Sequence, residues 1–380
     1  MIRLGLVGGG PGSFIGGVHR MAAELDRRMT LVAGAFSGDP ERSRRAGETY
    51  GIAPDRAYPS VEAMIAAEAQ RPDGIEAIAI ATPNHLHLQA ARAGLEAGLA
   101  VISDKPPAAT LAETRIIADL VARTGGLYAL TFTYSGYPML REARARIAAG
   151  EIGTVRKVIV EYLQGWLAAP IEQAGNKQAT WRVDPRRSGL GGCITDIGTH
   201  AFNLAEFATG LRVTSMLGDL GTVVPGRALD DDATILLRFD NAARGHIAVS
   251  QIASGERNDL TLRVYGERGS LSWSHEAADR LRISGSDGVE RILWQGSHGL
   301  ARTTMAATRL PTGHPEGFIE AFSNIYGDFA NAMRGPRSDL MQTIDHGIRA
   351  MAFVETAVTR NGQGWSPLLP ISPAINENAA

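Results

Sequence analysis

Three residues of this 380-residue chain have the types and spacing to move a proton: Lys105, Asp196 and His200. Lysine is rare here, since only three of the 38 basic residues are lysines, and Lys105 stands between an apolar segment and a proline. Asp196 and His200 have i, i+4 spacing, which on a helix places them on one face. A carboxylate beside an imidazole can hold its tautomer and stabilise its protonated form. Such a set could remove the proton of an alcohol while hydride leaves the same carbon.

A structural interpretation of the same pair is also open. Asp196 could cap a helix that begins near Ile197, since aspartate is a good N-cap residue, and His200 could fill a gap in the core. Lys105 and a glycine-rich segment occur in the same chain, and together they favour the catalytic interpretation. Whether Lys105 or His200 would be the base is left open.

The glycine-rich segment, Gly8–Gly16, follows a predicted strand, 2–7, and precedes a predicted helix. Gly8 and Gly10 match the first two glycines of a dinucleotide fingerprint, and Ser13 stands at the third position. In that motif the first glycine permits a tight turn and the second lets the backbone approach a pyrophosphate, to which the helix N-terminus offers amide donors. The placement predicts a bound dinucleotide rather than an ordinary turn.

The segment after the second predicted strand bears on which dinucleotide binds. The acid that commonly binds the adenosine ribose of NAD is absent there, and Ser37 occupies its place. Serine removes the repulsion that an acid would exert on a 2′-phosphate, and Arg42 could pair with that phosphate. These residues favour NADP or the use of both cofactors. The alternative is a solvated basic helix face and a site that takes NAD.

Two further segments come directly after predicted strands. Thr82–His87 follows the strand 75–80, and Asp104-Lys105-Pro106 follows the strand 100–102. Open α/β sheets bind ligands at the carboxyl ends of their strands, so both segments are expected at the cofactor. The full set of residues expected to contact it is Gly8, Gly10, Ser13, Phe14, Ile15, Ser37, Arg42, Thr82, Pro83, Asn84, His87, Asp104, Lys105 and Pro106.

The elements that must position these segments follow two patterns along the chain. Up to residue 131, short apolar strands alternate with amphipathic helices, which is typical of βαβ units and a parallel sheet covered on both faces. After residue 150 the strands alternate polar and apolar residues, which indicates an antiparallel sheet with one open face. These strands are expected near 156–162, 233–239, 246–250 and 260–266, and short ones near 271–273, 281–283 and 292–294. Helices are expected near 197–208, 315–333 and 339–359. We therefore predict an α/β chain with a dinucleotide-binding domain, 1–131, and a second domain, 132–380.

Composition narrows the function classes. A net charge of −2, with 44% hydrophobic and 21% charged residues, is ordinary for a globular protein and excludes a disordered chain. No basic excess indicates nucleic acid or an anionic membrane as a partner. The single cysteine, Cys193, excludes internal disulfides and fits a reducing compartment. Metal-ligand spacing, apolar spans and a signal-like N-terminus are not seen, so we expect a metal-free cytoplasmic protein.

A polar, aromatic segment, 164–182, shows few helix or strand signals. Long loops of this kind often bind ligands. The faces of Trp166 and Trp181 suit the C–H surfaces of sugars, and Lys177 and Arg182 can donate to hydroxyl groups. Alternatively, the two tryptophans simply cover the core beneath a loop.

Taken together, the glycine-rich segment, Thr82–His87, Asp104-Lys105-Pro106 and Gly191–His200 resemble the Gfo/Idh/MocA family of glucose–fructose oxidoreductase, inositol dehydrogenase and rhizopine-catabolism proteins. The resemblance covers nearly the whole chain. It implies an N-terminal Rossmann domain and a C-terminal α/β domain with a large, mostly antiparallel open sheet. It also implies homodimers or homotetramers joined through that sheet.

The resemblance further implies hydride transfer between NAD(P) and a carbinol or carbonyl carbon of a sugar, cyclitol or related polyol. In family terms Lys105 and His200 are the proton-transfer candidates, and Asp196 orients the substrate or the histidine. Tyr134 resembles a family position that lines the pocket. The residues expected to contact substrate are Tyr134, Trp166, Lys177, Trp181, Arg182, Asp196 and His200.

Two other functions remain compatible with this fold, because function depends on the site rather than the scaffold. One is a non-catalytic, nucleotide-sensing regulatory protein, which need not keep Lys105, Asp196 and His200. The other is a redox-neutral enzyme in which transient oxidation assists elimination or glycoside cleavage. The substrate, the carbon oxidised and the direction of reaction are left open.

Overall fold

A computed structural model describes residues 1–368, and within this range the side chain of Lys177 lies outside the description. The described chain forms two compact units. The first comprises Met1–Thr133 and Phe322–Ile348, and the second comprises Tyr134–Ala321 and the residues from Arg349 onward. A single boundary at residue 131 assigns Phe322–Ile348 to the second domain, whereas the structure groups these residues with the first. The predicted substrate contact of Lys177 falls on a side chain outside the described part of the chain.

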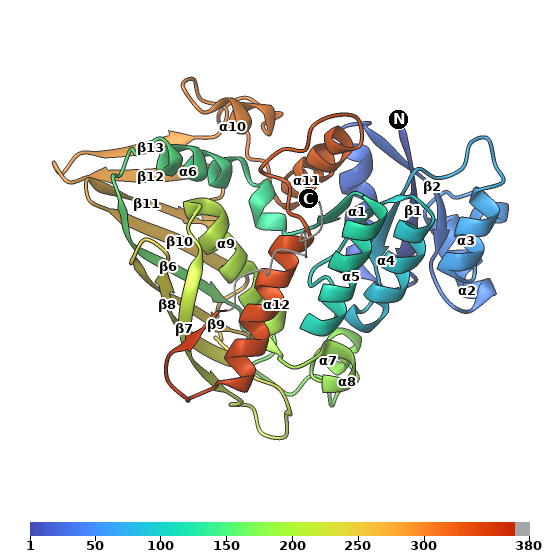
Figure 1. The fold of residues 1–380 in the computed structure, drawn as a ribbon, viewed down its shortest axis with the longest axis horizontal. Coiled ribbons are helices and arrows are strands. Elements are labelled where there is room, and N and C mark those ends of the chain that lie inside the picture. The colour runs from blue at the N-terminus through green and yellow to red at the C-terminus, as the bar shows by residue number, and fades with distance from the viewer. Residues whose placement is uncertain (369–380) are drawn as a thin grey trace, which may run out of the picture. The chain divides into compact units, whose positions relative to one another are not determined.

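The first unit contains a five-stranded parallel sheet in the order β2-β1-β3-β4-β5 (Figure 1). Because the chain runs from β1 to β2 on one side and then to β3 on the other, the strand order reverses beside β1, where such sheets bind ligands. The strands are β1 (Ile2–Gly8), β2 (Met29–Ala35), β3 (Ala77–Ala81), β4 (Ala100–Ser103) and β5 (Tyr128–Leu130). This confirms the predicted parallel βαβ fold.

Four of the five helices between the strands of this unit begin at side-chain caps. Ser13, Asp39, Ser60 and Thr110 each accept a backbone N–H from the residue three positions later, whereas the helix His87–Glu96 has no side-chain cap. Thr110 also forms a capping box, in which a glutamate side chain accepts its backbone N–H. The helices are α1 (Phe14–Leu25), α2 (Pro40–Thr49), α3 (Val61–Glu68), α4 (His87–Glu96) and α5 (Leu111–Thr124).

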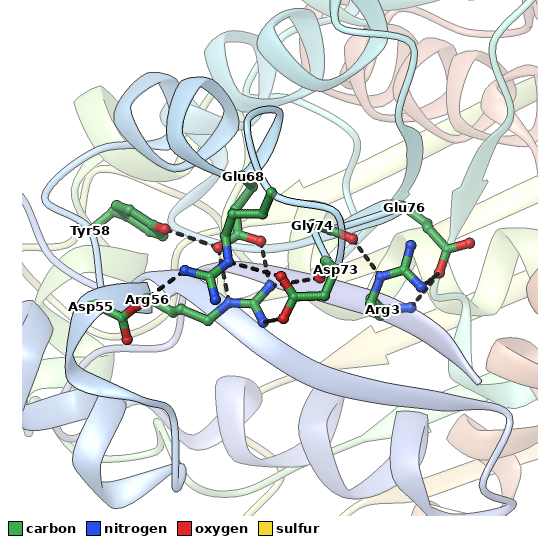
Figure 2. A network of polar contacts seen from close by, with 9 residues as sticks. Arg3, Asp55, Arg56, Tyr58, Glu68, Asp73, Gly74 and Glu76 are labelled. Carbon is green, nitrogen blue, oxygen red and sulfur yellow. Dashed lines mark hydrogen bonds and ion pairs between the residues drawn. The ribbon is translucent and has the colours of Figure 1, made fainter.

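A polar network secures the amino-terminal edge of this sheet (Figure 2). Arg56 and Glu68 form a buried ion pair, and Arg56 also reaches Asp73 at 3.2 Å. Arg3 at the start of β1 donates to the carbonyl of Gly74 at 2.6 Å. These contacts tie α3 and the turn before β3 to β1, at the edge away from the glycine-rich segment. The network therefore supports the frame rather than the site.

The second unit contains a nine-stranded mixed sheet in the order β13-β12-β11-β10-β6-β9-β8-β7-β14. Every neighbouring pair is antiparallel except β6 and β9, which run parallel. The strands are β6 (Val155–Leu163), β7 (Val213–Gly221), β8 (Asp232–Phe239), β9 (Arg244–Ser250), β10 (Asp259–Gly266), β11 (Gly269–Ser274), β12 (Arg280–Gly285), β13 (Glu290–Trp294) and β14 (Ser366–Pro367). The predicted mostly antiparallel sheet is confirmed.

One face of this sheet is covered and the other is open. On β8, Ile235 and Leu237 are buried whereas the intervening Leu236 and the next residue Arg238 are exposed. The helices α6 (Pro138–Ala148) and α9 (Thr199–Thr209) pack on the covered face (Figure 1). Elements that the sequence pattern did not predict are α6, β7, β14, α7 (Lys177–Arg182), α8 (Pro185–Ser188) and α10 (Arg302–Ala306).

The chain passes from one unit to the other within each of two long helices near the C-terminal end. They are α11 (Phe318–Ala332) and α12 (Ile344–Thr359), close to the predicted helices 315–333 and 339–359. His19 of α1 contacts Tyr326 of α11, with 2.6 Å between Nδ1 and Oη, inside the first unit. Phe202 of α9 stacks on Phe353 of α12 at a centroid distance of 4.6 Å, inside the second. Both contacts join segments that are distant in sequence.

Candidate active site

The glycine-rich loop after β1 has no room for a side chain at Gly8 or Gly10. A Cβ at Gly8, whose φ is +90°, would lie 2.6 Å from the carbonyl oxygen of Ala81. A Cβ at Gly10 would lie 2.5 Å from the carbonyl oxygen of Phe36. Both glycines are therefore required where the loop passes the ends of β2 and β3. The result is a bare backbone cradle at the N-terminus of α1, as a pyrophosphate requires.

Of the two residues that follow the glycine cradle, Ser13 caps the helix and Phe14 is exposed. The Oγ of Ser13 accepts the backbone N–H of Gly16 at 3.3 Å, so its side chain caps α1. Phe14 is 70% exposed at the first position of the helix. A hydrogen bond of 2.7 Å from the hydroxyl of Tyr50 to the carbonyl of Gly9 holds the loop from the side of α2. Tyr50 was not predicted, because its contact joins positions that are 41 residues apart.

At the end of β2 the loop contains an acid that the sequence prediction passed over. Ser37 Oγ accepts the N–H of Asp39 at 3.2 Å, and Asp39 Oδ1 accepts the N–H of Arg42 at 2.8 Å. Asp39 thus caps α2 and places a carboxylate two residues beyond Ser37. The guanidinium of Arg42 is exposed, while Arg44 pairs with Glu41 on the same helix. The local charge is therefore mixed rather than purely basic.

His87 connects the two predicted cofactor segments in the first unit. Its buried ring lies between the carbonyl oxygens of Thr82 and Pro106, 2.7 Å from Nε2 and 2.9 Å from Nδ1. Burial lowers the pKa of His87, and the two carbonyls partly oppose that shift. Because both ring nitrogens already contact protein carbonyls, His87 positions these loops. That His87 contacts the cofactor stays a prediction, and its ring nitrogens are already engaged by the protein.

The same loops hold one unpartnered polar atom. Among the described residues, none hydrogen-bonds the buried Oγ1 of Thr82 at the end of β3. A buried hydroxyl of this kind is costly unless another group satisfies it. Together with the glycine cradle beside β3, it fits a bound dinucleotide at the carboxyl ends of the parallel strands.

Asp104 orients the backbone that carries Lys105. Its Oδ1 accepts the N–H of Lys105 and the hydroxyl of Thr131, both at 2.9 Å. The next peptide bond, Lys105–Pro106, is cis. Lys105 itself is partly exposed just past the end of β4. The Asp104 carboxylate is therefore occupied in shaping the loop, a role that the sequence prediction did not separate from cofactor contact.

In the second unit, Asp196 lies inside a helix rather than at its start. A π-helical turn, η4 (Ile194–Gly198), runs directly into α9 and its Thr199, so the chain is helical on both sides of Asp196. The alternative that Asp196 caps a helix is therefore wrong. Single π-helical turns are rare and frequent at functional sites. Asp196 and His200 lie on one continuous helical segment, as their spacing predicts.

Asp230 anchors the start of that segment. Its carboxylate accepts the N–H groups of Gly192 and Ile194, both at 2.7 Å, and its carbonyl accepts the N–H of Cys193 at 2.8 Å. A Cβ at Gly192 would lie 2.3 Å from the Asp230 carbonyl oxygen, which explains the glycine. Burial raises the pKa of Asp230. No sequence signal connected Asp230 with the helical segment of Asp196, because Gly192 and Asp230 are 38 residues apart.

The carboxylate of Asp196 is held from both sides. Arg182 forms an ion pair with Oδ1, and Gln251 donates to Oδ2 at 2.9 Å. Arg182 was predicted to bind substrate directly, and the structure instead brings it to Asp196. It ends a short helix, α7, so the prediction of an irregular loop is corrected for these residues. Its guanidinium lies over the ring of Trp181, with 4.7 Å to the centroid.

The imidazole of His200 packs against tyrosine. It is nearly buried and stands perpendicular to the ring of Tyr134, with 5.1 Å between centroids. Tyr134 is buried, and its hydroxyl lies 2.5 Å from that of Tyr162. The hydroxyl of Tyr134 is thus engaged within the protein, although a substrate contact was predicted for this residue.

Both predicted sugar-binding tryptophans use their indole N–H groups internally. Trp166 Nε1 donates to Gln164 Oε1 at 3.0 Å, and Trp181 Nε1 donates to Gln178 Oε1 at 3.2 Å. Each indole is partly exposed. What either ring can offer a ligand is therefore an apolar face.

Several other site chemistries find no support in the structure. Cys193 is buried and burial raises the pKa of its thiol, which disfavours a thiolate nucleophile. Across residues 1–368, acidic, histidine and cysteine side chains form no group of three or more that could hold a metal ion. Within the same described range, no helix has the length and apolar character needed to cross a membrane.

Proteins of known family match both units. Residues 2–132 match the model described as oxidoreductase family, NAD-binding Rossmann fold, and residues 140–272 match the Gfo/Idh/MocA C-terminal domain. An uncharacterized oxidoreductase of Bacillus subtilis is 34% identical over 374 residues, covering 96% of this chain and 95% of its own. The levoglucosan dehydrogenase of Pseudarthrobacter phenanthrenivorans is 28% identical over 321 residues, covering 76% and 78%.

Solved structures agree over nearly the full length. An inositol dehydrogenase homolog of Azotobacter vinelandii, complexed with NAD⁺, has a TM-score of 0.91 and 36% identity, covering 96% of this chain and 97% of that one. Levoglucosan dehydrogenase complexed with NADH and levoglucosan has a TM-score of 0.83 and 25% identity, covering 97% and 100%. From this full-length similarity, with a dinucleotide cradle at the expected place, it follows that the chain is an NAD-binding oxidoreductase of the Gfo/Idh/MocA family.

Proposed function

We propose that the protein transfers hydride between a nicotinamide cofactor and a carbinol or carbonyl carbon of a sugar, cyclitol or related polyol. The observation that carries the proposal is the pairing of Asp196 and His200 on one helical segment, with the Asp196 carboxylate held by Arg182 and Gln251. Relatives named levoglucosan dehydrogenase and scyllo-inositol 2-dehydrogenase support this substrate class.

The proposed roles follow from the chemistry of each side chain. When bound, the nicotinamide accepts the hydride that leaves the carbinol carbon. Lys105 and His200 are the two candidates for removing the hydroxyl proton, as their ionisable nitrogens allow. Asp196 would orient the substrate hydroxyl or the histidine, with Arg182 and Gln251 fixing its direction. The faces of Trp166 and Trp181 would cover apolar C–H surfaces of the ring.

For the adenosine end, we propose that the site accepts both NAD and NADP. Ser37 leaves the position after β2 uncharged, and the exposed Arg42 can reach a 2′-phosphate by a charge-assisted bond. Asp39 opposes a phosphate electrostatically, which argues against strict NADP use. The structures of relatives complexed with NAD⁺ and NADH support NAD as one of the two.

The direct test uses purified protein with NAD and NADP in parallel, against pyranoses, inositols and aldonolactones, while the near-ultraviolet absorbance of the reduced cofactor is followed. We expect a rise with one of these substrate classes. Cofactor binding without any absorbance change across the panel would contradict the proposal. That outcome would favour a redox-neutral reaction or a nucleotide-sensing role.

We also propose that copies of the chain associate through the open face of the nine-stranded sheet and that the protein acts in the cytoplasm. The support for association is the exposed face of β8, where the apolar side chain of Leu236 is exposed. Sedimentation should give a dimer or tetramer for the wild type. Leu236→Lys should shift it toward the monomer, and an unchanged assembly would argue against this face.

A further inference from the structure

A closed ring of hydrogen bonds lies beside His200. Its members are Tyr134, on the turn η3 (Thr133–Gly136), Tyr162 on β6, and Asn258 just before β10. Tyr162 donates to Asn258 Oδ1 at 2.7 Å, the two tyrosine hydroxyls are 2.5 Å apart, and Asn258 Nδ2 reaches the Tyr134 hydroxyl at 3.4 Å. All three members belong to the second unit.

The direction of every bond in the ring is determined. Asn258 Oδ1 accepts from Gln164 Nε2 at 2.6 Å as well as from Tyr162, so the amide orientation of Asn258 is set. Tyr162 has one hydroxyl proton and gives it to Asn258, and Tyr134 must therefore donate to Tyr162. The amide N–H of Asn258 closes the circle on Tyr134. Hydrogen bonds that run in one direction polarise one another and strengthen the set.

Burial makes this ring rigid. Tyr134 and Tyr162 are only 3% and 4% exposed, and burial raises the pKa of both phenols, so both keep their protons. Tyr137 stacks on Tyr134 at a centroid distance of 5.8 Å and an interplanar angle of 14°. Because the plane and the hydroxyl of Tyr134 are both held, its ring forms a fixed wall for the perpendicular imidazole of His200.

We propose that Tyr134, Tyr162 and Asn258 are positioning residues that set the orientation of the His200 imidazole. The inference rests on the proposed catalytic role of His200. It adds Tyr162 and Asn258, neither of which is placed against substrate or cofactor. A small misplacement of a proton-transfer group lowers the rate strongly while leaving binding nearly intact.

Gln164 extends the ring toward the predicted sugar-binding segment. It donates to Asn258 and accepts the indole N–H of Trp166, so the amides of Gln164 and Asn258 are ordered in series. A substrate hydroxyl could accept a hydrogen bond from the indole N–H of Trp166 only if the bond from that N–H to Gln164 broke. The ring therefore ties the orientation of Trp166 to that of His200.

The test compares Tyr162→Phe with Tyr137→Phe as a matched control. Each removes one buried hydroxyl from the same aromatic cluster, but the hydroxyl of Tyr137 contacts His275 Nε2 at 2.9 Å and lies outside the ring. With the polyol that the wild type oxidises, we expect Tyr162→Phe to lower kcat about tenfold while KM changes less than about twofold. The pH profile of kcat should shift, and Tyr137→Phe should match the wild type in both.

Asn258→Leu supplies a second variant that keeps a similar side-chain size and adds no charge but removes both the acceptor for Tyr162 and the N–H donor to Tyr134. It should resemble Tyr162→Phe in its kcat and pH profile. Equal effects of Tyr162→Phe and Tyr137→Phe, or an unchanged kcat in both ring variants, would overturn the proposal.

An activity-independent readout separates this inference from the proposed function. The imidazole resonances of His200, assigned with a His200→Gln variant, should shift or broaden in Tyr162→Phe and stay in place in Tyr137→Phe. If no polyol is oxidised but these resonances behave as expected, the ring positions His200 and the proposed reaction fails. Unchanged resonances in Tyr162→Phe would overturn the ring whatever the activity.

Discussion

At the scale of single residues, the candidate chemistry depends on which atoms the protein already uses. The ring nitrogens of His87 and the carboxylate of Asp104 already contact backbone atoms of the loops after β3 and β4. Asp196 has both oxygens engaged, one by Arg182 and the other by Gln251. Lys105 is partly exposed on the same loop as Asp104. Residue types alone did not separate the groups that support the site from those that act in it.

Lys105→Met should abolish most hydride transfer while leaving the fold and the cofactor site in place. If Lys105 moves the hydroxyl proton, kcat should fall by about 10²–10⁴-fold, as is usual for loss of a general acid or base. Cofactor affinity, measured by fluorescence titration, should stay within about tenfold of the wild type. Lys157→Met, at an exposed position on β6, is the control and should retain full activity. Retained turnover in Lys105→Met would refute the catalytic role.

Arg42→Ala should weaken NADP binding selectively. A charge-assisted bond to a phosphate contributes about 1.5–3 kcal/mol, so the Kd for NADP should rise about tenfold or more while that for NAD stays unchanged. Arg45→Ala removes the same charge from the same helix at a residue that pairs with Glu41, and it should have little effect. Parallel losses of NAD and NADP affinity in Arg42→Ala would show that Arg42 does not contact the 2′-phosphate.

At the scale of elements, the start of one helix in each unit carries candidate functional residues. The N-terminus of α1 faces a backbone cradle that only glycine permits, whereas the segment with Asp196 and His200 begins with a π-helical turn held by Asp230. The first arrangement is local in sequence and carries a recognisable motif. The second joins Gly192 to a residue 38 positions later. Only the first could be predicted with its physical reason.

Asp230→Ala should therefore disturb the helical segment that carries Asp196 and His200. Two buried backbone N–H groups lose their acceptor, which should lower the free energy of unfolding by about 2–4 kcal/mol. Asp231→Ala is the matched control, since this adjacent buried carboxylate accepts the N–H groups of Val223 and Val224 at 2.7 and 3.0 Å.

Asp231 also pairs with the buried Arg227, so denaturant unfolding should show a loss in Asp231→Ala at least as large as that in Asp230→Ala. Among molecules still folded, however, kcat should fall much further in Asp230→Ala than in Asp231→Ala. Equal kcat values in the two variants would show that Asp230 does not position Asp196.

At the scale of the whole molecule, the return of α11 to the first unit links stability to pH. His19 is fully buried against Tyr326, and burial lowers its pKa from 6.5 to about 4. Between these values the unfolded chain binds a proton that the folded chain does not. The free energy of unfolding therefore rises with pH across this window and decreases as the pH is lowered from 6.5 to about 4. This contribution amounts to about 3 kcal/mol.

His19→Gln should flatten that dependence, because glutamine can still hydrogen-bond to Tyr326 but does not titrate. Denaturant unfolding at several pH values across the window measures the slope for both proteins. His298→Gln, at an exposed histidine, should keep the wild-type slope. An unchanged slope in His19→Gln would mean that another group causes the acid sensitivity.

By itself, the sequence determined the features that arise from neighbours along the chain. The glycine cradle, the parallel strands and the i, i+4 pair depend on local sterics and periodicity, and the structure confirms each of them. The fold class and the two sheets followed from the same local patterns. Element ends were less certain, and short elements such as α7 carry too few residues for a periodic signal.

Only the tertiary structure decided which distant side chains meet. The contact of Tyr134 with Tyr162 spans 28 residues, that of Gln251 with Asp196 spans 55, and that of His19 with Tyr326 spans 307. Such pairs are selected by the packing of whole elements, which brings specific donors and acceptors together inside a low-dielectric core. No spacing rule along a single chain encodes that choice. The residues that contact Asp196 and His200 could therefore be identified only from the packing of the sheet and its helices.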